Sequence, residues 1–151
     1  DKIDKIEGFR NYRRGRYSIG TMASLGTIIN ISSIAGKRGS SNNSAYCSTK
    51  FAMNGVTQAL AKELGQVNIR VNAICPVLIE TPGLLTAFEG SDSPASSQKS
   101  TFIDNFTKLN SALGRLPSAT DVAQLAYFLA SDDSRSITGQ CINLDCGVFP
   151  Q

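Results

Sequence analysis

Two short apolar segments with a long helical segment between them constrain the fold of this chain more than any other feature. Residues 27–32 and 68–75 are rich in isoleucine and valine and are predicted to form strands. The first has the continuous apolar character of a strand buried on both faces, and Pro76 stops the second. Residues 44–64 are predicted to form a helix capped by Gly65, with apolar side chains at helical spacing: Ala52, Met53, Val56, Ala59, Leu60 and Leu64. A helix flanked by two such strands predicts a βαβ unit with a right-handed crossover in a parallel sheet.

The rest of the 151-residue chain adds further helices and one more strand, within the size of a single α/β domain. Residues 4–24 are predicted to form a helix of uneven quality, because several glycines interrupt it. Two shorter helices are predicted around residues 102–109 and 118–129, the second with Ser118 as its N-cap. Residues 140–145 are predicted to form a third strand.

Polar side chains lie where a βαβ unit binds its ligands. In open parallel sheets ligands bind beyond the carboxyl ends of the strands, and here Ser33 follows the first strand while residues 76–81 follow the second. Tyr46 and Lys50 are four residues apart on the intervening helix, so they lie on one face, one turn apart. An ammonium group beside a phenol favours its ionised form, which suits Tyr46 to donate and accept a proton.

Ser33 could hold a substrate oxygen against Tyr46. Together, Ser33, Tyr46 and Lys50 predict a site that interconverts a carbonyl and an alcohol. A structural alternative stays open. A tyrosine and a lysine at this spacing are also common on solvated helix surfaces, and Tyr46 and Lys50 can equally pack a subunit interface.

Composition argues against several other classes of site. The net charge is only +3, and four arginines within residues 10–16 read as one solvated helix face, so no nucleic-acid binding is predicted. The chain has no histidine and no Cys-x-x-Cys pair among its four cysteines, so no metal site is predicted. The sequence shows no apolar run of about 20 residues and no signal peptide, and reduced thiols are expected. These features predict a cytoplasmic protein with no membrane segment.

One irregular segment separates the second strand from the later helices. Residues 83–97 are rich in glycine, serine and proline and show no clear period. A short predicted helix follows them. The whole segment 83–110 can be interpreted either as a lid over a ligand or as a surface insertion. The side chains of this segment do not identify a substrate.

Taken together, these landmarks resemble the C-terminal part of the classical short-chain dehydrogenase/reductase family over about residues 4–149. Residues 29–33 resemble the strand that ends in the family's catalytic serine, and Tyr46-Cys-Ser-Thr-Lys50 matches its Tyr-x-x-x-Lys element. Further matches follow in the family's order: Ile69-Arg-Val-Asn-Ala-Ile-Cys-Pro76, Glu80-Thr-Pro82, Gly114-Arg115, Asp121-Val-Ala123, Phe128-Leu-Ala-Ser131 and Ile137-Thr-Gly-Gln140. The fold that this resemblance implies is α/β, the C-terminal part of a Rossmann-like doubly wound parallel sheet.

The resemblance implies an NAD(P)-dependent oxidoreductase that moves a hydride between nicotinamide and a small alcohol or carbonyl substrate. Tyr46 would transfer the proton, Lys50 would promote ionisation of the phenol and bind the nicotinamide ribose, and Ser33 would orient the substrate oxygen. The residues that the resemblance places against the cofactor are Tyr46, Lys50, Pro76, Val77, Ile79 and Thr81. Both NAD and NADP stay open, as does the substrate, and a homodimer or homotetramer is implied.

The resemblance also implies that residues 1–151 make a single, partial domain. The strand, Gly-rich turn and helix with which the family grips the pyrophosphate have no counterpart here, so the N-terminal cofactor-binding half is expected to be absent. No asparagine stands near Lys5, Val77 replaces a family glycine, and Cys146 interrupts the usual Asp-Gly-Gly. Half a parallel sheet would expose a long apolar edge, which favours missing strands supplied elsewhere. The alternative function is a truncated, non-catalytic relative that acts as a binding or assembly subunit.

Overall fold

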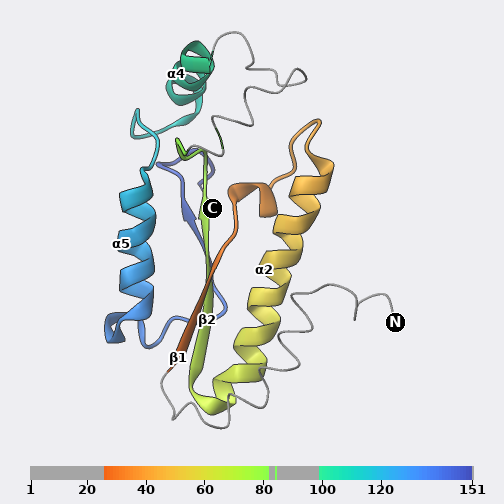
Figure 1. Ribbon diagram of the computed structural model, residues 1–151, viewed down its shortest axis with the longest axis vertical. Helices are drawn as coiled ribbons and strands as arrows, with labels where there is room; N and C mark the ends of the chain where they lie inside the picture. The colour runs from red at the N-terminus through yellow and green to blue at the C-terminus, as the bar shows by residue number, and fades with distance from the viewer. Residues whose placement is uncertain (1–25, 82–83, 85–98, 151) are drawn as a thin grey trace.

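The computed structural model describes residues 26–81, 84 and 99–150. In this part of the chain three parallel strands, in the order β1-β2-β3, form a sheet (Figure 1). Helix α2 covers one face, α5 covers the other, and α4 lies beyond the carboxyl ends of the strands (Figure 1). The elements are β1 (Gly26–Ile31), the 3-10 turn η2 (Ile34–Gly36), α2 (Ser44–Leu64), the 3-10 turn η3 (Gly65–Val67), β2 (Ile69–Pro76), α4 (Lys99–Asn110), α5 (Ala119–Ala130), the 3-10 turn η4 (Asp132–Ser134) and β3 (Cys141–Leu144). The predicted α/β class with a parallel sheet is confirmed, and the helix expected over residues 4–24 lies outside the described residues.

Strand β2 is the centre of the sheet and of the core. It pairs with β1 on one side and β3 on the other, so Ile74 stands opposite both Ile31 and Ile142. Val71 and Ile74 are fully buried. In β1, by contrast, Ile28 is 37% exposed and Ile31 is 49% exposed. The expectation of a strand buried on both faces is therefore wrong for β1, because within the described residues it has a paired neighbour on one side only.

Helix α2 packs on the sheet through a mixed polar and apolar stripe. Its buried residues are Cys47, Asn54, Thr57, Ala61 and Leu64. Ala52 and Ala59, two members of the expected apolar repeat, are exposed, so the repeat predicts the buried side only in part. The buried Thr57 hydroxyl accepts a hydrogen bond of 2.9 Å from the partly buried Asn30 Nδ2 on β1, so a polar side chain faces the sheet where the apolar repeat expected none. Among the described helices, even the long α2 lacks the apolar length needed to cross a bilayer.

The C-terminus of α2 combines a predicted cap with an unexpected turn. Gly65 is the C-cap, as predicted, but its φ of −58° is right-handed and the chain continues into η3. The left-handed residue is Asn68, with a φ of 60°, directly before β2. Asparagine tolerates this conformation better than most residues, because its short polar side chain can bond locally. The reversal of the chain between α2 and β2 therefore depends on Asn68 rather than on the glycine.

Two polar side chains of β2 fasten the C-terminal segment to the sheet. Arg70 Nη2 donates to Leu129 O near the end of α5 over 2.7 Å. Asn72 Nδ2 donates to Ile137 O over 2.8 Å, and Asn72 Oδ1 accepts from Gln140 N at 3.0 Å. Asn72 is fully buried, and both ends of its amide are paired, as burial requires. Side chains of β2 thus hold β3 in register together with the backbone pairing.

Ser118 caps helix α5, which confirms the sequence prediction. Ser118 Oγ accepts from Asp121 N at 3.2 Å, and Asp121 Oδ2 accepts from Ser118 N at 2.7 Å, which completes a capping box. Ser118 Oγ also donates to Asp121 Oδ2 over 2.8 Å. The bonds that Ser118 N and Ser118 Oγ donate to this carboxylate, and to a smaller degree the nearby Arg115 guanidinium, hold the pKa of the Asp121 carboxyl below its ordinary value of 3.8. The charge also lies at the N-terminus of the helix, where the helix dipole favours an anion.

We expect Asp121→Asn to unfold at a lower temperature than the unaltered protein at pH 7, because the amide cannot supply the charge-assisted cap. Folding lowers the pKa of this carboxyl, so its stabilisation is complete above the ordinary value of 3.8 and is lost as the pH falls through the lower folded-state value. The difference in Tm should therefore shrink at pH values below about 4. Asp104→Asn, at an exposed carboxylate inside α4, is the control and should change Tm little. A difference for Asp121→Asn that is equally large at pH 7 and in acid would contradict the assignment.

Candidate active site

Ser33 lies between the carboxyl ends of β1 and β2. It is the N-cap of the η2 turn, where its Oγ accepts from Ala35 N at 3.1 Å. The same hydroxyl donates to Pro76 O at the end of β2 over 3.5 Å, a long and therefore weak bond. Ser33 is only 9% exposed. The structure thus brings together the two strand ends that the sequence placed on one edge of the sheet.

Lys50 joins helix α2 to the same edge of the sheet. Its Nζ lies 5.6 Å from the centre of the Tyr46 ring, within the range of a cation–π contact. Nζ also donates to Ile31 O, the last residue of β1, over 3.0 Å. Tyr46 is 45% exposed, so its ring is open to a molecule arriving from solvent. The predicted pairing of tyrosine and lysine on one helix face is present in the structure.

Ser33 and Tyr46 approach this edge from different elements and share no direct hydrogen bond among the described residues. Lys50 connects them, because its ammonium binds the carbonyl of Ile31 two residues before Ser33 while its charge faces the Tyr46 ring. The three residues singled out from the sequence therefore form one cluster around the end of β1.

A tight junction between the η2 turn and helix α2 sets the geometry of this cluster. We call it the turn–helix junction; it consists of Ser32, Gly36, Lys50 and Asn54. Ser32 Oγ donates to Lys50 O over 3.3 Å, and Asn54 Nδ2 donates to Gly36 O over 2.9 Å. A Cβ atom on Gly36 would lie 2.6 Å from Lys50 O, so only glycine allows the two backbones to approach this closely. Sequence reasoning missed Gly36 and Asn54, although a polar residue one turn after Lys50 was a visible signal.

The loop after β2 carries the remaining predicted site residues. The carbonyl of Pro76 accepts from Ser33, and Val77 N donates to Leu144 O at the end of β3 over 3.2 Å. Val77 is only 7% exposed, so its side chain packs largely into the protein. Thr81 Oγ1 accepts from Leu84 N at 3.2 Å, and Ile79 is partly exposed. The first part of this loop is fixed to both flanking strands.

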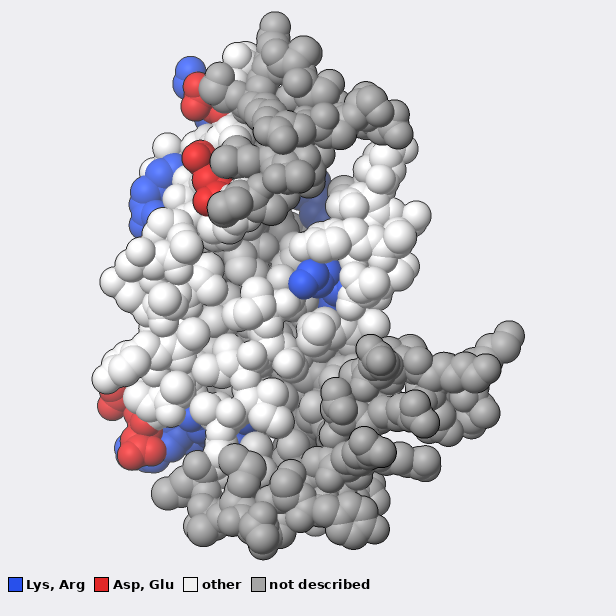
Figure 2. Space-filling view, viewed as in Figure 1, with Lys and Arg blue, Asp and Glu red and all other residues white. Residues whose placement is uncertain are grey.

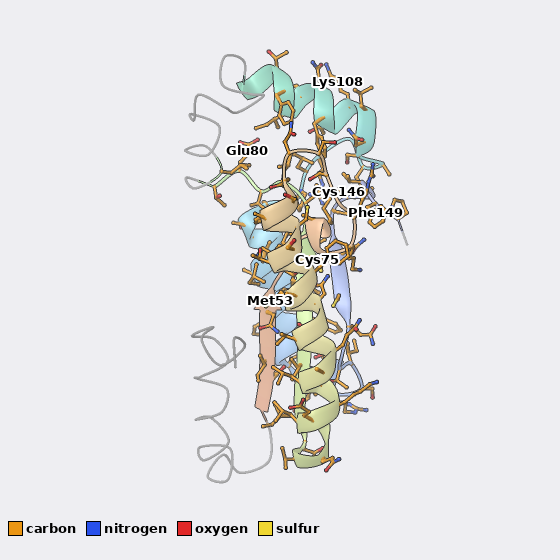
Figure 3. The ribbon with its side chains drawn as sticks, turned by 90° about the vertical axis from the view of Figure 1, so that its right-hand side faces the viewer. Met53, Cys75, Glu80, Lys108, Cys146 and Phe149 are labelled. Atoms are coloured by element: carbon orange, nitrogen blue, oxygen red, sulfur yellow. The ribbon has the colours of Figure 1, made fainter. Side chains whose placement is uncertain are left out.

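A hollow of about 350 Å³ lies between α4 and the start of α5. Glu80 belongs to its lining and, in Figure 3, lies past the strand ends on the side of α4. The other lining residues are Ile103, Asp104, Thr107 and residues 116–119. Helix α4 forms most of the described part of the segment 83–110, and it lies beside this hollow near the loop after β2. Residues 85–98 lie outside the described residues.

The two strand cysteines are poorly suited to nucleophilic chemistry. Burial raises the pKa of the Cys75 thiol, partly offset by the positive charge of Lys37. Burial and the neighbouring Cys75 raise the pKa of Cys141 as well. Cys75 is fully buried on β2 near helix α2 (Figure 3), and its Sγ donates to Asn54 Oδ1 over 3.7 Å. Cys75 is therefore a small, neutral core side chain, and Cys141 is a neutral, partly exposed one.

A tight turn at Asp145, Cys146 and Gly147 follows β3. Cys146 is left-handed, with a φ of 53°. The Asp145 carboxylate accepts from Gly147 N at 3.0 Å and from Phe149 N at 2.8 Å, which closes the turn. Leu113 N, just after α4, donates to Cys146 O over 3.2 Å. The turn therefore anchors the chain that leaves α4, next to the site.

Comparison with known proteins identifies the relatives of this chain. The profile of a protein family described as Enoyl-(Acyl carrier protein) reductase matches residues 12–149. The chain is 45% identical over 129 residues to the short-chain dehydrogenase/reductase aba4 of Botryotinia fuckeliana, which covers 83% of this chain and 46% of the relative. It is 40% identical over 123 residues to the (S)-acetoin-forming diacetyl reductase of Staphylococcus aureus. This alignment covers 82% of this chain and 47% of that protein.

Solved structures agree with these relatives. A structure described as ElxO with NADP bound aligns with a TM-score of 0.71 at 32% identity, over 91% of this chain and 52% of that one. The chain thus spans about half the length of the curated relatives it matches.

We expect Gly36→Ala to lower the free energy of unfolding by about 1–3 kcal/mol, the usual cost of overpacking a close contact. The added methyl group would press on the backbone of α2 at Lys50, which cannot rotate away. Denaturant unfolding measures this cost. Gly55→Ala is the control. Gly55 lies on α2, and a Cβ atom added there would have no other atom within 4 Å. This substitution should raise stability by about 0.5–1 kcal/mol. Equal effects of the two substitutions would contradict the close approach.

Proposed function

The chain belongs to the short-chain dehydrogenase/reductase family, and from this premise we propose that it interconverts an alcohol and a carbonyl as an NAD(P)-dependent oxidoreductase, with Tyr46 as acid and base. The observation that carries the proposal is the position of Lys50, whose ammonium lies between the Tyr46 ring and the end of β1. This position gathers a proton-transferring phenol, a cation and the buried Ser33 hydroxyl at the edge of the sheet where ligands bind.

Tyr46 has the exposure and the electrostatic partner that proton transfer requires. Its ring is 45% exposed, so the phenol oxygen can meet the oxygen of a bound substrate. In the reduction direction Tyr46 donates its proton to the developing alkoxide, and in the oxidation direction it accepts the proton of the alcohol. The Lys50 ammonium stabilises the negative charge that the phenol oxygen carries after donation.

Ser33 is placed to orient the substrate oxygen. Its hydroxyl proton is directed at Pro76 O over 3.5 Å, a bond weak enough to be exchanged for a better acceptor. A substrate oxygen at the strand edge would be such an acceptor, and the hydroxyl would keep its bond from Ala35 N during the exchange. A donor aimed at an oxygen that becomes negative stabilises the transition state.

The residues at this edge fit the nicotinamide end of NAD or NADP. Nicotinamide supplies or accepts the hydride in this chemistry. An ammonium group has three protons, and Lys50 Nζ gives one to Ile31 O, which leaves two for the ribose hydroxyls. The loop from Pro76 to Thr81, with Val77 and Ile79 between, would face the carboxamide, and the Thr81 hydroxyl accepts from Leu84 N and keeps its own proton for the cofactor.

The surface near the site fits a small molecule better than a nucleic acid. In Figure 2 the basic side chains of the described residues form small, separate groups on a mostly uncharged face. We propose that helix α4, which borders the hollow near Glu80, lies beside the substrate. Free cysteines agree with a cytoplasmic location, and the proposal of a homodimer or homotetramer rests on the family resemblance.

We expect Tyr46→Phe to lower kcat by about 10²- to 10⁴-fold, the usual contribution of general acid–base catalysis. Unaltered protein is first screened for oxidation and reduction of secondary alcohols and ketones with both cofactors. The variant should keep its Tm and its affinity for NAD(P)H, because only a hydroxyl is removed from a half-exposed ring. Tyr127→Phe, at a tyrosine that is 79% exposed on α5, is the control and should keep full activity. Full activity of Tyr46→Phe would rule out the proposed proton transfer.

We expect Lys50→Met to lose turnover and also to bind NAD(P)H more weakly, because methionine keeps the apolar stem but has no ammonium for the ribose or for Tyr46. Titration of NADH and NADPH fluorescence measures the affinity. Lys62→Met, in the last turn of the same helix, is the matched control and should bind like the unaltered protein. If cofactor affinity stays the same in Lys50→Met, Lys50 does not contact the ribose.

A further inference from the structure

Asn54 is a buried polar residue. The proposed proton transfer alone does not explain why a polar side chain is buried at this position. It lies one turn after Lys50 on α2 and is 8% exposed. Its Nδ2 donates to Gly36 O over 2.9 Å, and its Oδ1 accepts from Cys75 Sγ at 3.7 Å. One side chain thus connects the helix, the η2 turn and strand β2.

Both partners of Asn54 belong to the segments that hold Ser33. Gly36 ends the η2 turn whose N-cap is Ser33. Cys75 directly precedes Pro76, whose carbonyl accepts from the Ser33 hydroxyl. Asn54 therefore ties the helix that carries Tyr46 and Lys50 to both supports of the serine.

The contacts on either side of Asn54 show that the turn–helix junction is closely packed. Ser32 Oγ donates to Lys50 O, and a Cβ on Gly36 would meet the Lys50 backbone at 2.6 Å. A Cβ there would also lie 2.9 Å from Asn54 Nδ2. With so little free space, a change at Asn54 moves the turn of helix that carries Lys50 relative to the turn that carries Ser33.

We propose that Asn54 is a positioning residue of the reaction, which fixes Lys50 and Tyr46 relative to Ser33 through its bonds to Gly36 and Cys75. This inference rests on the proposed function. An apolar residue of similar size would fill the site, but it would leave the buried Gly36 carbonyl without its donor, which is costly. A buried amide with a partner on each of its two polar atoms instead specifies one arrangement of helix, turn and strand.

Thr57 provides a matched comparison on the same helix. It is fully buried, lies one turn after Asn54, and its Oγ1 accepts from Asn30 Nδ2 at 2.9 Å. Its partner belongs to β1 and not to the η2 turn. Thr57→Val removes this bond, together with the bond that Thr57 Oγ1 donates to Met53 O over 2.8 Å within the helix, and leaves Gly36 and Cys75 with their partners. It therefore reports the cost of losing side-chain bonds of α2 that do not involve the supports of Ser33.

The first test compares Asn54→Leu with Thr57→Val in steady-state kinetics. For Asn54→Leu we expect kcat to fall by roughly 10- to 100-fold, as small misplacements of reacting groups do. The KM of the carbonyl substrate should stay within about threefold, since Asn54 does not contact substrate. Thr57→Val should lower Tm and keep kcat. If Asn54→Leu does not fold, Asn54→Ala carries the same comparison. A kcat for the Asn54 variant that matches Thr57→Val would overturn the proposal.

The second test does not depend on turnover. Ring-labelled tyrosine gives an NMR signal for Tyr46, which is identified by its loss in Tyr46→Phe. We expect this signal to move in Asn54→Leu, because the ammonium facing the ring is displaced, and to stay in place in Thr57→Val. A signal that is unchanged in Asn54→Leu, or that moves equally in both variants, would overturn the positioning role. Absence of turnover in the unaltered protein would instead overturn the proposed oxidoreductase function, and the NMR comparison would still decide the role of Asn54.

Discussion

The close approach of the η2 turn to helix α2 is the contact on which the rest of the site depends. Gly36 lets the turn lie against the helix backbone at Lys50, where any larger residue would collide with a carbonyl group. Once the two backbones are this close, Asn54 can reach the Gly36 carbonyl and Ser32 can reach that of Lys50. The ammonium of Lys50 then falls beside the end of β1. A contact between two backbones thus determines where the charged group of the site lies.

This arrangement also explains why the interface between helix and sheet is so polar. Apolar side chains on a helix can slide and rotate against a sheet at small cost, because the hydrophobic effect is not directional. Buried hydrogen bonds are directional and costly to leave unmade. The bond between Asn30 and Thr57 joins α2 to β1, whereas the bonds of Asn54 fix the distance of α2 from the η2 turn. A helix that must hold Tyr46 at a defined place gains more from such bonds than from additional apolar contacts.

The same distinction decides what the sequence could predict. Periodicity and strand composition were sufficient for the parallel sheet, the long helix and the α5 cap, since these depend on local patterns. The spacing of Tyr46 and Lys50 was sufficient to place them together, because one helical turn fixes that relation. Periodicity failed for the buried face of α2, where Thr57 is buried and Ala59 is exposed, since a polar side chain that pairs with the sheet lies on that face. Asn54 was missed because its partners, Gly36 and Cys75, are distant in sequence and lie on two different elements.

Hydrogen bonds hold the backbone at Val77 and Cys146, the two residues that stand where the family resemblance would place glycine. At Cys146 a left-handed φ of 53° is strained for a residue with a Cβ, but the Asp145 carboxylate binds two backbone N–H groups of the same turn and holds it. At Val77 the N–H is taken by Leu144 and the side chain packs inward, so the peptide keeps its place between the strand ends. In both cases the hydrogen bonds belong to the backbone around the substituted residue and not to its side chain. These bonds fix the backbone at the ends of β2 and β3, where the Pro76 carbonyl accepts from the Ser33 hydroxyl and Val77 N–H binds Leu144.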